Sequence, residues 1–487
     1  MTRNVALIVL DTVRKDYFDE YAPRLRLRSD TSFEQARAAS SWSVPSHTSI
    51  FTGQLPSEHG VHAESFDSSF DFSQFSREET CFGALPDHHT AGFSANSYIN
   101  SHFGADALFD EFHDFSIGSH TAESLYVEGI TVQEYMEATD EPSAVKRYLG
   151  FLRRCLGHEH PAKSLANGVW AKTGPTVKSL PVPVPELVDD GAAVISDRVG
   201  ETAERVDEPW FFFANYMDAH TPLRNLLQHD RSLHSVPNSW SSTEIDKWEL
   251  NKDGLATETY TQHYRDVYGA AIDYLDRQVT DLIDRLQAAT DGETTVVVTA
   301  DHGHNLGYDA DDGLFHHTGS MTEGVMHVPL EIVNAPDGFP AQESRLFSQL
   351  DLGELLARIA HEEAYDDYLF PKRVPAETVG LLGGDNRTWG RDFSEEEFAW
   401  WNRMMRCVYE GTTKRQWNSV GDAVEYRLDP ERPSWQEAVE TELDLAPADR
   451  EPFETGLEAY KGRVSAASQD TDFDDEVADR LEELGYL

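Results

Sequence analysis

The stretch Val5-Ala6-Leu7-Ile8-Val9-Leu10-Asp11 decides the fold class. Six consecutive apolar residues without polar alternation are typical of a strand that is buried on both faces of a parallel sheet. Further buried strands are expected at 210–216, 294–299 and 328–333, and a weaker candidate lies at 90–94. The chain therefore contains the buried strands of a large central sheet.

Helical patterns lie between these strands. Apolar residues recur at helical spacing over 264–286, with a polar opposite face. We also expect a turn at 43–46 that leads into a helix from Thr48 to Gly53. Alternation of strands and helices predicts an α/β layered fold with a mostly parallel sheet, in which ligands bind beyond the carboxyl ends of the strands.

The C-terminal part has a different pattern. Short runs at 407–410, 413–417 and 425–428 predict an antiparallel sheet in a small α+β subdomain. We therefore expect a main domain over 1–375 and a C-terminal subdomain over 376–487, which ends in an acidic helix at 474–484.

An insertion is expected at about 115–205. It is more basic than the rest of the chain, partly helical, and includes a proline-rich connector at 180–185. It would either recognise an anionic substrate or form a cap that packs on the main domain.

The charge excludes some classes of protein. The 487 residues hold 87 Asp and Glu against 40 Lys and Arg, a formal net charge of -47, yet 39% are hydrophobic, which is enough for a large core. Such a surface repels phosphate groups, so we expect neither a nucleic-acid binder nor direct binding to an anionic membrane. The even spread of the carboxylates indicates a halophilic source of the haloarchaeal type.

The three cysteines, Cys81, Cys155 and Cys407, are too few and too far apart to predict a disulfide framework or a zinc site. No apolar run approaches the ~18 residues of a transmembrane helix, and the N-terminal apolar run is too short for a signal peptide. We therefore expect a soluble cytoplasmic protein without a membrane span. Nothing in the sequence indicates an oligomeric state.

Polar residues follow three of the predicted strands, namely Asp11, then Asp218 with His220, then Asp301 with His302. Asp11 alone would either cap the next turn or bind a cation. Mixed carboxylate and imidazole ligands suit Mn²⁺, Zn²⁺ or Mg²⁺ better than a pure calcium cage.

Ser43 precedes a predicted helix and has two readings. It is either an ordinary N-cap serine or a hydroxyl placed where a helix N-terminus favours negative charge. His316 and His317 follow in a loop rich in glycine, and each histidine alone would be structural. As a set, these strand-end residues indicate a metal-assisted hydrolase of a charged ester.

The ordered motifs resemble a known family. They are Val-Leu-Asp11-Thr12-Val13-Arg14, Ser43-Val44-Pro45-Ser46-His47 with Phe51-Thr52-Gly53, Tyr216-Met217-Asp218-Ala219-His220-Thr221-Pro222, Thr299-Ala300-Asp301-His302-Gly303, His317 and His327-Val328-Pro329-Leu330. This order is similar to that of the sulfatase family of the alkaline phosphatase superfamily. The resemblance implies an alkaline-phosphatase-like three-layer sandwich.

The resemblance also implies a divalent metal (Mn, Mg, Ca or Zn) held by Asp11, Asp301 and His302. Thr12 stands where many members have a further Asp ligand. Asp218, with His220 and His317, has the composition of a second metal site, so that either one metal or two would be bound.

Ser43 falls at the position of the family's nucleophile, which in sulfatases is oxidised to formylglycine. The modification signal has an Arg where this chain has His47, which favours an unmodified serine acting on phosphorus. His220 and His317 would hold the non-bridging oxygens or protonate the leaving group. Arg14, His47 and Asn96 would contact the substrate.

Three functions follow from these expectations. The first is hydrolysis of a sulfate or phosphate ester on a small sugar, lipid or aryl group, through Ser43 or its formylglycine form. The second is transfer of a phospho- or sulfo-linked headgroup, and the third is a non-catalytic binding protein on the same scaffold.

Overall fold

The structure is a computed structural model. It describes residues 2–66, 70–116, 129–130, 132–139, 143–178, 185–207, 209–290, 292–317, 319–381 and 393–467. The expected acidic helix at 474–484 lies outside the described residues, as do positions 180–184 of the expected connector.

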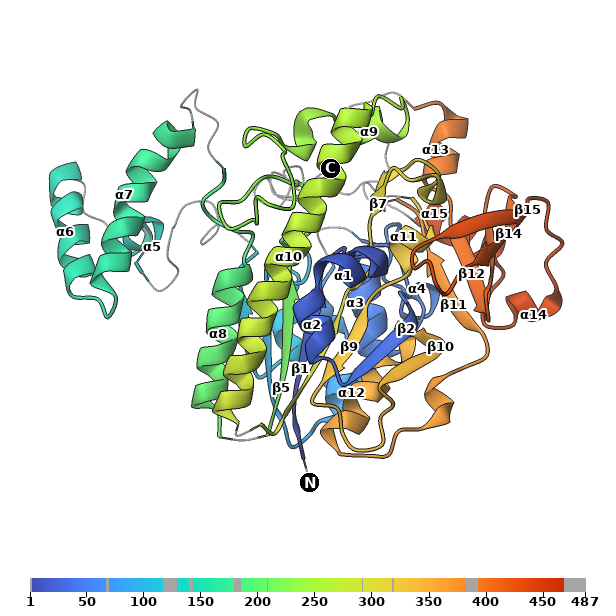
Figure 1. Cartoon of the computed structure of the whole chain (residues 1–487), viewed down its shortest axis with the longest axis horizontal. Coiled ribbons are helices and arrows are strands. Elements are labelled where there is room, and N and C mark those ends of the chain that lie inside the picture. The colour runs from blue at the N-terminus through green and yellow to red at the C-terminus, as the bar shows by residue number, and fades with distance from the viewer. Residues whose placement is uncertain are drawn as a thin grey trace.

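An eight-stranded sheet forms the centre of the protein (Figure 1). Its strand order is β10 (Gln342–Ser348), β2 (Thr31–Arg37), β9 (Leu330–Val333), β6 (Thr294–Thr299), β1 (Asn4–Leu10), β5 (Trp210–Tyr216), β3 (His89–Ser94), β4 (Glu111–Asp114). Within this central sheet, the described neighbouring strands pair in parallel except at β9, which is antiparallel to both β6 and β2. The predicted, mostly parallel central sheet is therefore confirmed.

The three central strands are the apolar runs of the sequence. All residues of β5 and β6 are buried, and so is β1 apart from Asn4. Contact on both faces explains why these runs carry no polar alternation.

Helices cover both faces of the sheet (Figure 1). On one face, α8 (Ala192–Arg205) and α10 (Glu258–Ala289) pack against each other. On the other face, α3 (Ser43–Thr52) packs against α12 (Leu352–Ala360), which contacts β1. The helix predicted at 264–286 is the middle of α10, whereas α8 lies in the range expected for the insertion but packs on β5 and β3.

The expected turn at 43–46 is wrong, because α3 already begins at Ser43. Pro45 belongs to the first turn of this helix, where backbone N–H groups have no intrahelical partner and a proline costs little. Trp42, not Ser43, is the N-cap, and Gly53 ends the helix at a φ of 70°.

A small helical unit stands to one side of the main body (Figure 1). It consists of α5 (Val132–Glu137), α6 (Ala144–Leu156) and α7 (Pro161–Lys178), which pack on one another. Phe151, Cys155 and Trp170 are buried inside it.

The C-terminal part forms a five-stranded antiparallel sheet of β11 (Val374–Thr378), β12 (Met405–Glu410), β13 (Thr413–Asn418), β14 (Ala423–Leu428) and β15 (Gln436–Glu440). The division expected between residues 375 and 376 falls inside β11. One face, with Cys407 and Tyr409, joins the main core. The other face, with Val408 and Trp417, packs against α15 (Leu457–Ala467).

The remaining named elements are short. They are α1 (Lys15–Tyr21), α2 (Pro23–Arg28), α4 (Pro56–His59), α9 (Lys247–Asn251), α11 (Glu323–Met326), α13 (Glu395–Trp401), α14 (Pro447–Arg450), β7 (Asn305–Leu306) and β8 (Phe315–His316).

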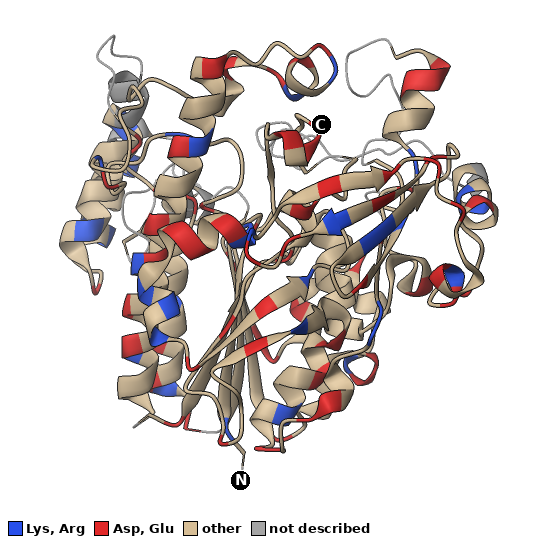
Figure 2. Ribbon diagram, turned by 45° about the vertical axis from the view of Figure 1, so that its right-hand side comes forward, with Lys and Arg blue, Asp and Glu red and all other residues tan. Residues whose placement is uncertain are grey.

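Acidic residues lie on helices, strands and loops alike (Figure 2). Within the described residues, no helix is both long enough and apolar enough to cross a membrane.

A buried ion cluster joins the small sheet to the main domain. Glu323 is 1% exposed and lies between Arg37, whose Nε is 3.0 Å from Oε2, and Lys414, whose Nζ is 3.3 Å from Oε1. Tyr409 donates a hydrogen bond of 2.8 Å to the same carboxylate. One carboxylate is therefore the counter-charge that two buried cations share at the junction of the two sheets.

Glu323→Ala should lower the free energy of unfolding by about 3–5 kcal/mol, because it leaves two buried cations without a counter-charge. Denaturant unfolding in molar salt measures this loss. Glu354→Ala is the matched control, because Glu354 pairs with Arg358 on the surface at 2.9 Å and such pairs contribute under about 1 kcal/mol. Equal losses in the two variants would contradict the assigned role.

Candidate active site

Strand register brings two carboxylates to one level beyond the sheet. The parallel pairing of β1 with β6 aligns Val9 with Thr299, so Asp11 and Asp301 each follow two residues later. One potential ligand atom from each of Asp11, Asp301 and His302 lies within 4.8 Å of the others, and all three side chains are fully buried. Among the described residues, this is the group of three with such spacing.

These three residues present unsatisfied atoms. Asp11 Oδ1, Asp301 Oδ2 and His302 Nε2 have no hydrogen-bond partner. The His302 ring is oriented by a 2.9 Å hydrogen bond from Nδ1–H to the Gly303 carbonyl, which leaves Nε2 with a free lone pair. Two carboxylate oxygens and one imidazole nitrogen form a donor set that fits a divalent cation.

The two carboxylates also perturb each other. Burial and then the charge of Asp301 raise the pKa of Asp11 well above its usual range. Burial acts in the same direction on Asp301, but His302 and His47 outweigh it and lower the pKa of that carboxyl. Like charges this close are unfavourable unless a proton or a cation lies between them.

Ser43 lies against this pair. Its hydroxyl donates a 3.2 Å hydrogen bond to Asp11 Oδ2, and Asn96 Nδ2 donates one of 2.7 Å to the same oxygen. As the first residue of α3, Ser43 stands at the positive end of the helix dipole. The local reading as an N-cap serine is wrong, because the hydroxyl bonds to Asp11 across the sheet edge.

His47 lies one helical turn after Ser43. Its Nδ1–H donates to the Ser43 carbonyl at 2.8 Å and is 3.6 Å from Asp301 Oδ2, and its Nε2 accepts from Asn215 Nδ2 at 3.0 Å. Burial lowers its pKa, so the ring is neutral at pH 7. Sequence reasoning missed Asn215, although an amide near the end of the apolar strand β5 was a usable signal.

His220 and His317 join the same cluster. The ring centroid of His317 is 4.4 Å from that of His302 and 5.8 Å from that of His220. Nδ1 of His220 lies 2.6 Å from the Thr221 carbonyl, to which it hydrogen-bonds. Nδ1 of His317 makes the same kind of bond to the Ser41 carbonyl at 2.9 Å. Burial lowers the pKa of His220 to about 4 and that of His317 well below its usual range.

A further histidine, His304, was not expected. Its ring is 6.1 Å from that of His317, and its Nε2 is 2.7 Å from the Tyr264 hydroxyl. It extends the imidazole cluster away from the sheet edge, toward α10.

Arg14 differs from its expected role as a substrate ligand. Its guanidinium pairs with Asp16 at 2.7 Å and with Asp311 at 3.0 Å, and also donates to the His304 carbonyl at 3.0 Å. The side chain is 1% exposed. These contacts place Arg14 in an ion cluster that touches the imidazole cluster through the His304 carbonyl.

Thr12 and Asp218, the two possible further ligands, make hydrogen bonds to the backbone, and Asp218 Oδ2 has no hydrogen-bond partner among the described residues. The Thr12 hydroxyl donates to the carbonyls of Asp11 at 2.6 Å and Ala219 at 3.1 Å, while its backbone N–H donates to Asp301 at 3.3 Å. Asp218 accepts from the Asp190 N–H at 3.1 Å, and burial with the nearby Asp189 raises its pKa well above the usual range. In the described part of the chain, Asp218 forms no three-ligand group with His220 and His317.

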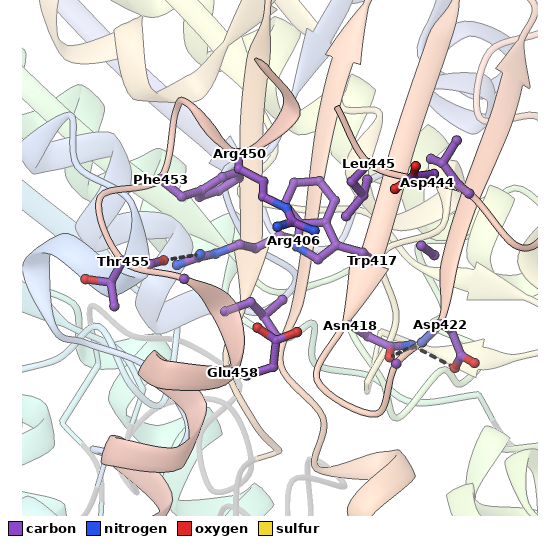
Figure 3. Close-up of a pocket in the computed structure, with 15 residues that line it drawn as sticks. Arg406, Trp417, Asn418, Asp422, Asp444, Leu445, Arg450, Phe453, Thr455 and Glu458 are labelled. Atoms are coloured by element: carbon purple, nitrogen blue, oxygen red, sulfur yellow. Dashed lines mark hydrogen bonds between the residues drawn. The ribbon is translucent and has the colours of Figure 1, made fainter. Parts of the chain in front are cut away.

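A cavity of about 290 Å³ lies elsewhere, on the small sheet (Figure 3). Arg406, Trp417, Arg450 and Phe453 line part of it, and Arg406 donates to the Thr455 carbonyl at its edge. It shares no residue with the strand-edge cluster, by which we mean Asp11, Ser43, His47, His220, Asp301, His302 and His317.

The sequence profile of the sulfatase family matches residues 3–361. The chain belongs to the sulfatase family. The match contains every residue of the strand-edge cluster, and the sequence matches none of the curated proteins.

Solved structures share the fold of this sulfatase-family protein. A phosphonate monoester hydrolase of Agrobacterium radiobacter is 15% identical, with 87% of this chain and 89% of that chain covered and a TM-score of 0.54. A 2-O GAG sulfatase is 13% identical, with coverages of 98% and 96% and a TM-score of 0.54. A protein in complex with its substrate D-glucosamine-2-N,6-O-disulfate is 13% identical, with coverages of 88% and 91% and a TM-score of 0.55.

Asp11→Asn should raise the melting temperature of the metal-free protein by about 2 °C at pH 8, because it removes one of two buried like charges. The gain should shrink toward pH 5, since a raised pKa in the folded state costs stability only where Asp11 must ionise. Thermal melting in chelator at both pH values, together with metal analysis, checks this. Asp284→Asn, at an exposed pair with Arg28, is the control, and a lower melting temperature for Asp11→Asn would contradict the assignment.

Proposed function

We propose that this protein is a metal-dependent hydrolase of small anionic sulfate or phosphate esters, with Ser43 as the nucleophile. One observation carries the proposal. The Ser43 hydroxyl bonds to Asp11 Oδ2, while the other oxygen of Asp11 belongs to the group of unsatisfied atoms with Asp301 and His302. Nucleophile and cation site thus share one carboxylate.

The cation ligands in this proposal are Asp11, Asp301 and His302, and when bound the divalent cation supplies the positive charge that favours an ionised nucleophile and stabilises the transferred group. Asn96 fixes the Asp11 oxygen that holds the Ser43 hydroxyl. Ser43 is the first residue of α3, and the positive end of the helix dipole favours negative charge there.

His220 and His317 are the candidates for moving the leaving-group proton. The Nδ1–H of each ring donates to a backbone carbonyl, so Nε2 is the basic nitrogen that would accept or return the proton. Both rings are neutral in the free protein because burial disfavours their charged form. An anionic ester beside them would raise their pKa values and favour the protonated, donating form.

The class of ester follows from charge balance. Asp11 and Asp301 together neutralise a divalent cation, and His47, His220 and His317 are neutral, so the site offers little excess positive charge. This favours monoanions, such as sulfate monoesters and phosphate diesters, over dianionic phosphate monoesters. His47 in place of the arginine of the modification signal favours an intact serine, and therefore the phosphate diester.

Ser43→Ala should lower kcat for a nitrophenyl ester by at least about 10³-fold, because the nucleophile is lost. Metal content should stay near that of the wild type, since Ser43 is not among the three ligands. Steady-state kinetics and metal analysis measure both. Ser49→Ala on the same helix is the control, because its hydroxyl bonds to His59 instead of the carboxylate pair. Activity that survives in Ser43→Ala would remove Ser43 from this role.

Mass spectrometry of the peptide that contains Ser43 should give the mass of intact serine, whereas formylglycine would be lighter by two hydrogen atoms. In a parallel assay in molar salt with Mn²⁺, Mg²⁺, Ca²⁺ or Zn²⁺, an aryl phosphate diester should then be cleaved faster than aryl phosphate monoester or aryl sulfate. Formylglycine together with sulfatase activity would reverse the preference for phosphorus. Metal binding without turnover of any of these esters would contradict the hydrolase proposal.

A further inference from the structure

Helices α6 and α7 of the helical unit carry the opposite charge to the rest of the chain, while α5 of the same unit adds Glu134 and Glu137. Residues 143–178 contain seven Lys and Arg residues and one acidic residue, Glu159, in a chain whose formal net charge is -47. The unit stands to one side of the main body (Figure 1).

Helix α6 also exposes apolar side chains. Leu149 is 59% exposed and Leu156 is 67% exposed, with the half-buried Leu152 between them at helical spacing. Phe151 and Cys155 lie on a different face and are buried inside the unit. The exposed leucines are thus additional to the residues that hold the helices together.

Basic residues flank this apolar stripe. Lys146 and Arg153 are exposed on α6 beside the leucines, whereas the exposed Arg154 lies on the opposite side of the helix. Helix α7 adds Val169, 62% exposed, with exposed Lys172 one turn later. An amphipathic helix with leucines on one side and Lys or Arg beside them is the pattern of a helix that lies in the interface of a lipid bilayer. Long basic side chains can place their stems along apolar surface and their charges at anionic headgroups.

A second copy of the chain fits this surface less well. Its acidic coat would supply the charge, but the large apolar residues exposed outside the helical unit are spread over separate elements, as with Leu27 on α2, Leu255 before α10 and Val439 on β15. An anionic lipid surface supplies both negative charge and an apolar layer. We propose that the unit of α6 and α7 docks the protein on an anionic lipid surface as a peripheral contact.

This proposal reverses, for one part of the molecule, the expectation drawn from the net charge. That expectation averaged the charge over the whole chain. At 1 M salt the Debye length is about 3 Å, so a carboxylate on the main body no longer acts on a membrane that touches α6. The local excess of positive charge and the leucines then decide whether the protein binds.

Flotation with lipid vesicles tests the proposal on the full chain. The protein should float with phosphatidylcholine vesicles that contain phosphatidylglycerol, and much less with phosphatidylcholine alone, in about 1 M salt, where the carboxylates of the main body are screened. Leu149→Gln with Leu156→Gln should lower the bound fraction about tenfold, because the apolar contact is lost. Lys146→Glu with Arg153→Glu should abolish the preference for the anionic vesicles, because these two cations lie beside the leucines.

Leu27→Gln with Leu255→Gln is the matched control, since these leucines are 88% and 53% exposed outside the unit. Melting temperature and turnover of a soluble ester should match the wild type in all three double variants. Equal binding to both vesicle types, or no loss of binding in the Leu149 and Leu156 variant, would overturn the proposal. Self-association in solution that this variant abolishes would overturn it too, and would assign the surface to a second copy.

Discussion

Two carboxylates buried side by side, Asp11 and Asp301, are the constraint on which the rest of this structure depends. Parallel pairing of β1 and β6 brings them level, and no described cationic side chain pairs with either one as a permanent counter-charge, since the ion-pair partners near Asp301 are His47 and His302. Burying two carboxylates without a counter-charge is unfavourable, so this pair lowers the stability of the metal-free fold, and a divalent cation would remove that loss. The surrounding amides and imidazoles hold these atoms in place without neutralising them.

Much of the fold could be predicted from the sequence, because β1, β5 and β6 each contain an apolar run and polar residues follow each strand. The position of Asp11, Asp301 and His302 at one edge followed from the rule for parallel sheets. The start of α3 was predicted wrongly because Pro45 looked like a turn, although a proline in a first helical turn is well tolerated. The sequence could not show that Arg14 contacts Asp311, since that contact spans almost 300 residues and depends on the finished fold.

The buried cluster around Glu323 has a bearing on the site as well as on the domain junction. Glu323 begins α11, only a few residues after His317, and its carboxylate is held by Arg37 from β2 and Lys414 from β13. The start of α11 is thus held by side chains from both sheets. Lys414 also donates a hydrogen bond to the Met321 carbonyl, so the small sheet contacts the chain just before α11 as well.

The acidity of the chain does not conflict with an anionic substrate, because the carboxylates form two populations. Most lie on the surface, where salt screens them beyond about 3 Å at molar concentration (Figure 2). Asp11 and Asp301 are buried, and salt screens such a pair much less, so their charge acts on any ligand unless a cation offsets it. Anion binding then depends on the cation and on proton uptake by neutral imidazoles, not on the net charge. Because salt screens distant surface charges from one another, the basic α6 can present a surface of opposite sign on the same molecule.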